Sequence, residues 1–318
     1  HKISRWQSIT YRSKEQSTMN INRIIVPPIK SQGIKTKLVR WIRAIVPSDY
    51  EGRWIEPFMG SGVVTFNIRP NKALLADSNP HIVNFYNAVA NGEITAVTTR
   101  QFLQKEGAEL LRTEGEYYYL VRERFNRYGN PLDFLFLNRA CFNGMIRFNQ
   151  HREFNVPFCR KPNRFSKAYI TKIANQVKAI ADICNLGKYE FRCQDYTVTI
   201  AEASANDILY CDPPYIQRHT DYFNGWDEND ERQLAKLLAD TKARFILSTW
   251  HSNKYRKNQF INEIWSKYNI LTKEHFYYVG TKEDNRNQML EALVTNFGAS
   301  YEEKNSQKVA QLSLFEKK

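Results

Sequence analysis

The chain has 318 residues, of which 42% are hydrophobic, and its 46 basic against 33 acidic side chains give a net charge of +13. This length accommodates one large domain or two, and no apolar run reaches membrane-spanning length, which excludes a protein built from transmembrane helices. The positive charge favours a polyanionic partner, although it also suits an ordinary basic surface. The five cysteines are scattered and without C-x-x-C spacing, so we expect no disulfide framework or zinc site, and a reducing cytosol.

The N-terminal residues 1–18 carry no hydrophobic periodicity and precede Met19. We expect them to form a disordered basic arm, unless they lie outside the native chain. Residues 34–46 place apolar side chains at helical spacing and predict a helix. Strands over 53–58 and 73–77, each followed by a helix, then start a βα alternation, and the second of these helices is predicted over 80–90.

The alternation stops near residue 93 and resumes with a helix near 168–184. Helices are predicted near 99–113 and 115–127, followed by a polar and aromatic segment. Later strands are predicted near 189–194, 207–211, 244–249, 273–279 and 291–297. Together these elements predict an α/β fold with a mostly parallel sheet. We expect a catalytic domain over 19–92 and 170–299, an inserted and mainly helical domain over 93–169, and a flexible tail over 300–318.

The tetrapeptide Asp212-Pro213-Pro214-Tyr215 follows an apolar run that predicts a buried strand. It therefore stands at the carboxyl edge of the sheet, where open α/β folds bind ligands. Proline removes amide donors and restricts φ, so this loop presents hydrogen-bond acceptors. Such a site suits an exocyclic amino group on a flat heterocycle that stacks on Tyr215. The alternative is an ordinary strand-ending turn, because Asp and Pro are common turn residues.

A second motif, Glu56-Pro-Phe58-Met-Gly60-Ser-Gly62, follows the first predicted strand, and Asp77 ends the next one. The glycines allow a sharp turn close to a ligand, and an acidic residue in the place of Asp77 binds ribose hydroxyls in nucleotide-binding α/β folds. Glu56 would repel a pyrophosphate and attract a sulfonium or an amino group. The loop therefore indicates S-adenosyl-L-methionine and not NAD, unless Glu56 is a solvated loop residue or a helix partner.

Six segments of the chain resemble the Dam-like family of DNA adenine-N6 methyltransferases, over about residues 22–299: 26–35, 56–62, 134–139, 142–149, 154–158 and 212–215. Within that family they are most similar to the EcoRV modification methyltransferase. The resemblance implies a Rossmann-like methyltransferase sheet that uses S-adenosyl-L-methionine, with an inserted DNA-recognition domain. It also implies a bacterial, nucleoid-associated enzyme that acts on double-stranded DNA at a GATATC-like site, either as an orphan or beside a cognate restriction endonuclease.

The resemblance also implies roles for individual residues. Asp212, Pro213 and Tyr215 would hold the target adenine. The cofactor would be bound by Lys35, Glu56, Phe58, Gly60, Gly62, Asp77 and Asp195. Ser31 stands where the Dam enzymes carry a Trp, so the contact there must differ. Two of these residues have plain alternatives, since Asp195 could be a helix cap and Lys35 a solvated helix residue.

The DNA-reading residues are expected inside the insertion. Asn143-Gly144 is a tight-turn signal and predicts a hairpin or loop. In the resembling enzymes this region enters the DNA, which implies contacts from Phe142, Asn143, Met145, Arg147 and Asn149. Arg147 could bind a guanine in a bidentate manner, and phosphate contacts are expected from Arg160, Lys161 and Arg164. Each residue alone could instead be a core or surface residue.

The implied reaction is a direct methyl transfer without a metal or a covalent intermediate. Asp212 and the carbonyl of Pro213 would accept the two amino hydrogens of an adenine flipped out of the duplex. The rival functions are methylation of RNA or of a protein amide, and DNA binding without catalysis. The last motif, Gln311-Leu312-Ser313-Leu314-Phe315, resembles the peptide that docks on the bacterial sliding clamp, although a frayed terminus is the alternative.

Overall fold

The computed structural model describes residues 23–216, 226–278 and 286–299. The predicted basic arm over 1–18 and the clamp-binding motif over 311–315 lie outside these residues and stay predictions. Within the described ranges, no helix combines the length and the apolar character needed to cross a bilayer.

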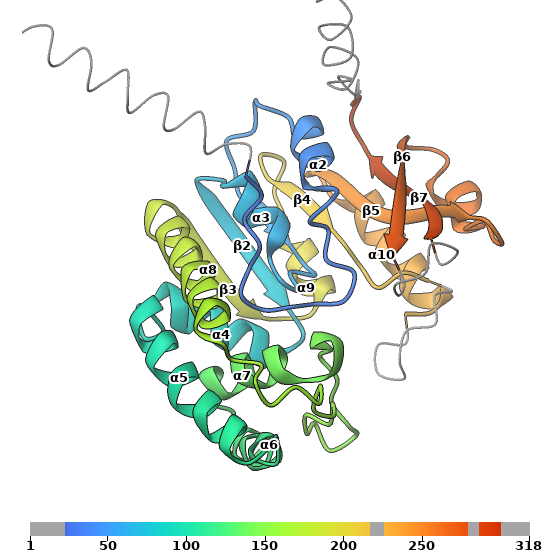
Figure 1. The fold of residues 1–318 in the computed structure, drawn as a ribbon. Helices are drawn as coiled ribbons and strands as arrows, with labels where there is room; N and C mark the ends of the chain where they lie inside the picture. Colours follow the sequence, from blue (N-terminus) through green and yellow to red (C-terminus); the bar gives the residue numbers. More distant parts are fainter. Residues whose placement is uncertain (1–22, 217–225, 279–285, 300–318) are drawn as a thin grey trace, which may run out of the picture.

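The described residues form a seven-stranded sheet with the order β3-β2-β1-β4-β5-β7-β6. Its strands are β1 (Trp54–Glu56), β2 (Lys72–Asp77), β3 (Lys188–Cys193), β4 (Ile208–Cys211), β5 (Arg244–Asn253), β6 (Asn269–Tyr278) and β7 (Arg286–Thr295). Strands β1 to β5 are parallel to one another, and β7 runs antiparallel to both β5 and β6. The predicted α/β fold with a mostly parallel sheet is confirmed (Figure 1).

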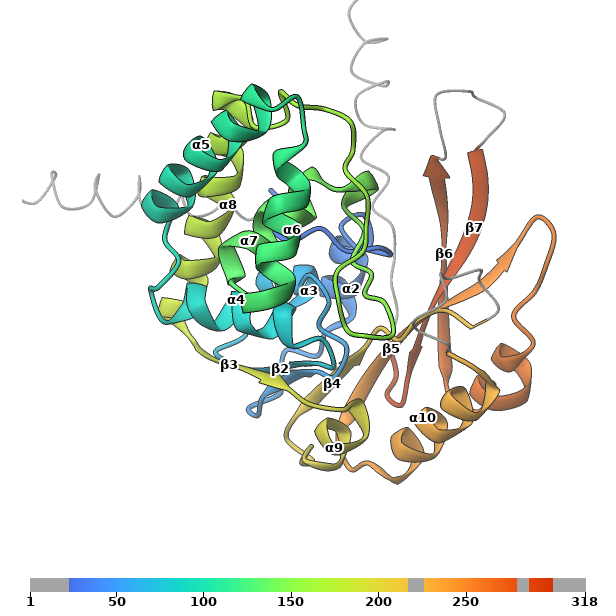
Figure 2. The ribbon, with the colours of Figure 1, turned by 90° about the horizontal axis from the view of Figure 1, so that it is seen from below.

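Helices cover both faces of the sheet, which is why every residue of the central strands β1 and β4 is buried (Figure 2). Along β4, Ile208 and Tyr210 face α2 (Val39–Ile45) and α3 (Val63–Ile68). Leu209 and Cys211 point to the other face, which is covered by α9 (Tyr196–Ala201), α10 (Glu228–Asp240) and η2 (Ile261–Trp265). This alternation places successive residues of one strand in two separate hydrophobic clusters.

The predicted insertion is helical. It contains α5 (Ala96–Arg112), α6 (Tyr117–Tyr128), α7 (Pro131–Ala140) and the short η1 (Phe142–Gly144), and it leads into α8 (Lys167–Leu186). Its apolar side chains share one cluster with α4 (Pro80–Ala90) and with residues of β2 and β3. Arg124 on α6 links this layer, with ion pairs of 2.8 Å to Glu106 and 2.5 Å to Asp133. The insertion is therefore packed against the sheet through this shared cluster.

Capping residues, prolines and glycines in the sequence determine where these helices begin. Asn79 accepts a hydrogen bond from the amide of His81, and Pro80 occupies the first turn, so α4 begins where the sequence predicts. The predicted helix over 34–46 is shorter, because Gly33 has φ of +70° and the chain first makes a turn at Lys35. That turn leaves residues 31–35 as a loop above the sheet edge.

The predicted turn at Asn143-Gly144 is a 3₁₀ turn and not the end of a hairpin. Both residues have positive φ, of 54° and 66°. Strand-like pairing occurs later, between Phe148 and Phe154. The turn that closes it depends on Asn149, whose side-chain oxygen accepts hydrogen bonds from the amides of His151 and Glu153, each 2.9 Å long.

Candidate functional site

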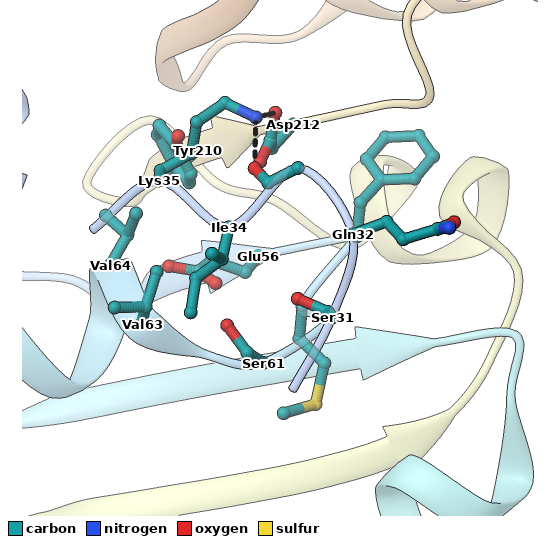
Figure 3. Close-up of a pocket in the computed structure, with 14 residues that line it drawn as sticks. Ser31, Gln32, Ile34, Lys35, Glu56, Ser61, Val63, Val64, Tyr210 and Asp212 are labelled. Carbon is teal, nitrogen blue, oxygen red and sulfur yellow. Dashed lines mark hydrogen bonds and ion pairs between the residues drawn. The ribbon is translucent and has the colours of Figure 1, made fainter. Parts of the chain in front are cut away.

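A pocket opens at the carboxyl edge of β1 and β4 (Figure 3). The loop over 31–35 lies across it, and the glycine-rich loop after β1 forms its other wall. Its lining comprises Ser31, Gln32, Gly33, Ile34, Lys35, Glu56, Phe58, Met59, Gly60, Ser61, Val63, Val64, Tyr210 and Asp212. The fold thus brings both sequence motifs and Lys35 to one place, because parallel strands end at the same edge.

The glycine-rich loop is shaped by two left-handed residues, since φ is +48° at Gly60 and +69° at Gly62. A Cβ atom at Gly62 would lie 2.5 Å from the ring of Phe66, so this position has no room for a side chain. The amide of Gly60 donates a 2.9 Å hydrogen bond to Asp77. The second oxygen of Asp77 accepts from the amide of Asn79 at 2.8 Å.

Asp77 therefore holds the loop against the end of β2. Burial raises the pKa of Asp77, while the amides of Asn79 and Gly60 lower it in part. Each carboxylate oxygen accepts one backbone hydrogen bond, which leaves a lone pair on each for a hydroxyl donor. Asp77 itself does not line the pocket, but it holds Gly60, which does.

Glu56 is 2% exposed and lies inside the pocket wall. One of its oxygens accepts hydrogen bonds from Trp54 at 3.0 Å and from Thr65 at 2.6 Å. Burial raises the pKa of Glu56 to about 7, against these hydrogen bonds, and the charge of Asp212 raises it further. Thr65, three residues after Gly62 on α3, thus anchors Glu56 as a hydrogen-bond donor.

Asp212 faces Lys35 across the pocket. The ammonium nitrogen of Lys35 lies 2.7 Å from Oδ1 of Asp212, and it donates a 2.9 Å hydrogen bond to the carbonyl of Gly33. Lys35 is therefore the partner of the buried Oδ1 atom of Asp212. Burial raises the pKa of Asp212, the charge of Lys35 lowers it, and Glu291 raises it.

Tyr215 carries its ring next to the same ammonium, which lies 4.7 Å from the ring centroid. Its hydroxyl donates a 2.6 Å hydrogen bond to Glu291 on β7 and lies 3.4 Å from the hydroxyl of Ser248. Tyr215 is 8% exposed, and Glu291 is fully buried. Burial raises the pKa of the Tyr215 hydroxyl, and the carboxylates of Glu291 and Asp212 raise it further.

Glu291 was not predicted from the sequence. It is a single charge within the apolar run Met289-Leu-Glu-Ala-Leu-Val294, and that pattern is the signal that could have indicated it. Glu291 and Glu56 both interact electrostatically with Asp212, so three carboxylates act on one another in this part of the structure. Such an excess of negative charge in a buried site favours a cationic ligand.

A second set of side chains lies at the far end of the glycine-rich loop. Phe58 stacks on Tyr196 with centroids 5.0 Å apart, and the edge of Trp226 contacts it at 5.6 Å. Asp195 is exposed and caps α9, accepting hydrogen bonds from the amide and the hydroxyl of Thr197. The helix-cap alternative for Asp195 is therefore seen in the structure, beside an aromatic surface that the sequence analysis did not identify.

Some of the predicted DNA-reading residues of the insertion are exposed, and others form hydrogen bonds with neighbouring residues of the insertion. Phe142 is 51% exposed, next to the left-handed Asn143, whereas Met145 packs partly against the hydrophobic cluster. Arg147 donates to the side-chain oxygen of Asn155 at 2.8 Å. Asn149 forms the turn described above and also donates to Glu153 at 2.9 Å.

The three predicted phosphate-binding residues also differ. Arg160 and Lys161 are exposed. Arg164 is half-buried, and it donates to the carbonyl of Arg139 at 2.9 Å and to the hydroxyl of Tyr169 at 2.8 Å. Two of the three side chains are thus presented to solvent, and the third supports the domain.

Comparison with known proteins agrees with this geometry. The family described as D12 class N6 adenine-specific DNA methyltransferase matches residues 31–279, which include the glycine-rich loop and the Asp212 tetrapeptide. The chain is 32% identical to a DNA adenine methylase of Serratia marcescens over 248 residues, covering 73% of this chain and 86% of that protein.

Two further relatives carry names of type II methyltransferases. The chain is 26% identical to M1.LlaDCHI of Lactococcus lactis subsp. cremoris, over 87% of this chain and 98% of that protein. It is 27% identical to M.FokI of Planomicrobium okeanokoites over 87% of its own length, and it spans 43% of the length of that relative. The Dam-like resemblance of the motifs is confirmed, and the chain belongs to the D12 class of N6 adenine-specific DNA methyltransferases.

Proposed function

We propose that this enzyme methylates N6 of an adenine that has been flipped out of duplex DNA, within a GATATC-like site. The observation that carries the proposal is the carboxylate of Asp212, which directly follows β4 in the pocket wall and is paired with Lys35 through Oδ1 at 2.7 Å. A carboxylate has several lone pairs, so Asp212 can also accept a hydrogen bond from an exocyclic amino group. The GATATC-like site rests on the motif resemblance to the EcoRV modification methyltransferase, which also suggests a restriction–modification or an orphan role.

S-adenosyl-L-methionine supplies an electrophilic methyl group on a sulfonium when it is bound. The pocket fits this cofactor because its buried carboxylates favour a cation. We assign the glycine-rich loop with Gly60 and Gly62 to its close support, and Asp77 to its ribose hydroxyls. Phe58 and Asp195 are assigned to its adenine, beside Tyr196 and Trp226.

The chain's own residues then prepare the amino group. The lone pair of an adenine amino nitrogen is delocalised into the ring, so the nitrogen is a weak nucleophile. Asp212 and the carbonyl of Pro213 accept its hydrogens, which localises the lone pair and stabilises positive charge as it develops on nitrogen. Lys35 holds Asp212 in its ionised form, since its charge lowers the pKa of that carboxyl. The negative charges of Glu56 and Glu291 also stabilise positive charge on the nitrogen, although Glu291 raises the pKa of Asp212 against the effect of Lys35.

Phe142, Asn143, Arg147 and Asn149 are proposed to read the DNA, with Met145 supporting their segment. Arg160 and Lys161 are proposed to bind phosphates, with Arg164 beside them. The test is incubation with labelled S-adenosyl-L-methionine and two duplexes of equal composition, only one containing GATATC. We expect label at N6 of the first adenine of that site. Equal labelling of both duplexes would remove the proposed site, and an enzyme that binds the cofactor but labels no adenine would remove the proposed function.

A further inference from the structure

Strand β5 extends well beyond its parallel neighbour at the edge that carries the pocket. Only Arg244–Leu247 pair with β4, whereas β5 continues to Asn253. The chain then reverses, and a bridge between Ser252 and Lys257 closes a small hairpin. We call residues 251–258 the β5 hairpin. Because Asp212 directly follows β4 at the same edge, the hairpin projects on the side of the sheet that carries the proposed target-base site.

The β5 hairpin is held in one shape by its two asparagines. The side-chain oxygen of Asn253 accepts from the amides of Tyr255 at 2.9 Å and Arg256 at 2.8 Å. Asn258 is 2% exposed; its side chain donates to the carbonyl of Trp250 at 2.9 Å, and its amide donates to His251 at 2.9 Å. Asparagine turns of this kind restrict the backbone, so side chains at the tip are presented in a defined direction.

The base of the hairpin contacts the catalytic tetrapeptide directly. Trp250 donates a 3.0 Å hydrogen bond to the carbonyl of Ile216, the residue after Tyr215. Trp250, Tyr215 and Met289 also form one small buried cluster. The position of the hairpin is therefore coupled to the position of the tyrosine that is proposed to stack on the base.

The tip has the composition of a surface that binds a polyanion. It reads Lys254-Tyr-Arg-Lys257, and no acidic residue occurs between His251 and Asn262. Tyr255 is 75% exposed, and the ammonium of Lys254 lies 5.7 Å from its ring centroid. The hairpin belongs to the end of the sheet formed with β6 and β7, away from helices α5, α6 and α7 of the insertion (Figure 2).

We propose that the β5 hairpin is a second DNA-binding surface, which contacts the sugar-phosphate backbone on the side of the target base opposite the insertion. Lys254 and Lys257 bind phosphates, and Tyr255 packs on the backbone sugars between them. This inference rests on the proposed function, since it requires a duplex at the pocket. Its consequence is that DNA is held from two sides, so the everted base is positioned relative to Asp212 by contacts on both flanks.

The test uses the salt dependence of DNA binding. Each phosphate contact contributes about 0.9 to the slope of log K against log salt, so Lys254→Gln with Lys257→Gln is expected to lower the slope by about 1.8. The matched control is Lys188→Gln with Lys242→Gln. These lysines are equally exposed, but they lie at the start of β3 and just before β5, at the opposite edge of the sheet. The control is expected to keep the slope and the methylation rate of the parent enzyme.

The outcomes separate the two proposals. A hairpin variant that binds S-adenosyl-L-methionine normally but keeps the parent slope, or a control that loses as much slope as the hairpin variant, would overturn the inference while the proposed function stands. A parent enzyme that neither binds nor methylates any duplex would overturn the proposed function itself. If the double variant fails to bind the cofactor, the single variants Lys254→Gln and Lys257→Gln decide, each with an expected loss of about 0.9 in slope.

Discussion

Polar side chains are concentrated both in the pocket at the end of β4 and in the segment over 141–160 of the insertion. The two regions differ in the burial and the bonding of these side chains. In the pocket, Glu56 is buried, and Asp212 is paired with Lys35 at 2.7 Å. In the insertion, Arg147 and Asn149 are bonded to their own neighbours, Asn155 and Glu153. Buried charges interact strongly and exposed ones weakly. Substitutions in the pocket should therefore change the chemistry, and those in the insertion should change binding.

The largest effect is expected at Asp212. Asp212→Ala removes the acceptor that localises the lone pair, and loss of one such group lowers the rate by about 10²–10³-fold. Asp212→Asn keeps the shape but replaces a charged acceptor by a neutral amide, so its rate should lie between those of the parent and the Ala variant. Single-turnover methylation measures the rate, and cofactor titration checks that the pocket is intact. An Ala variant with more than half of the parent rate would contradict the assignment.

The next largest effect is expected at Glu291. Glu291→Gln weakens the hydrogen bond of Tyr215 from a charged to a neutral one, a loss of about 1 kcal/mol or a five- to tenfold lower rate. It also removes a charge that raises the pKa of Asp212, so the acid limb of the pH–rate profile should move to lower pH.

Tyr215→Phe provides the matched control for Glu291. It removes the same hydrogen bond and leaves the carboxylate in place, so it should lower the rate without moving the acid limb downward. Identical pH profiles for both variants would show that Glu291 acts only through the position of the ring.

The role of Glu56 can be tested through the pH dependence of cofactor affinity. The pKa of Glu56 is raised to about 7, so the fraction of the ionised carboxylate grows as pH rises from 6 to 8. Because the ionised form attracts a cationic ligand, cofactor affinity should increase over this range by a factor of up to about ten. Glu56→Gln should bind more weakly at pH 8 and show a flatter pH dependence. Isothermal titration with the cofactor at three pH values measures both, and an unchanged slope in the variant would exclude Glu56 as the titrating group.

The smallest effect on the fold is expected at Phe142. It is 51% exposed, whereas Phe154 in the same segment is 1% exposed. Phe142→Ala should change the free energy of unfolding by less than about 0.5 kcal/mol and weaken duplex binding by several-fold. Phe154→Ala should destabilise the protein by about 3–5 kcal/mol. Thermal unfolding and DNA titration separate the two, and a large loss of stability in Phe142→Ala would place that side chain in the core.

Much of the fold follows from short-range patterns. The predicted strands and helices are present, and α4 begins and ends as its Asn-Pro start and apolar spacing predict. The turn at Asn143-Gly144 is present as predicted, with positive φ at both residues. The turn at Asn149 was not predicted, and it accompanies the packing of Phe148 against Phe154. The spacing of residues along the sequence does not indicate that these two rings will be in contact.

The sequence by itself determined the family and the two motifs that meet in the pocket, because adjacent parallel strands bring their ends together whatever the rest of the chain does. Only the tertiary structure decided the partners of those motifs. Glu291 reaches Tyr215 from 76 residues away, and Trp250 joins the β5 hairpin to Ile216. Such contacts depend on the antiparallel addition of β7 to the sheet and on the extension of β5 beyond β4. No local sequence pattern predicts the place of β7 or the length of β5, because both depend on how distant segments pack.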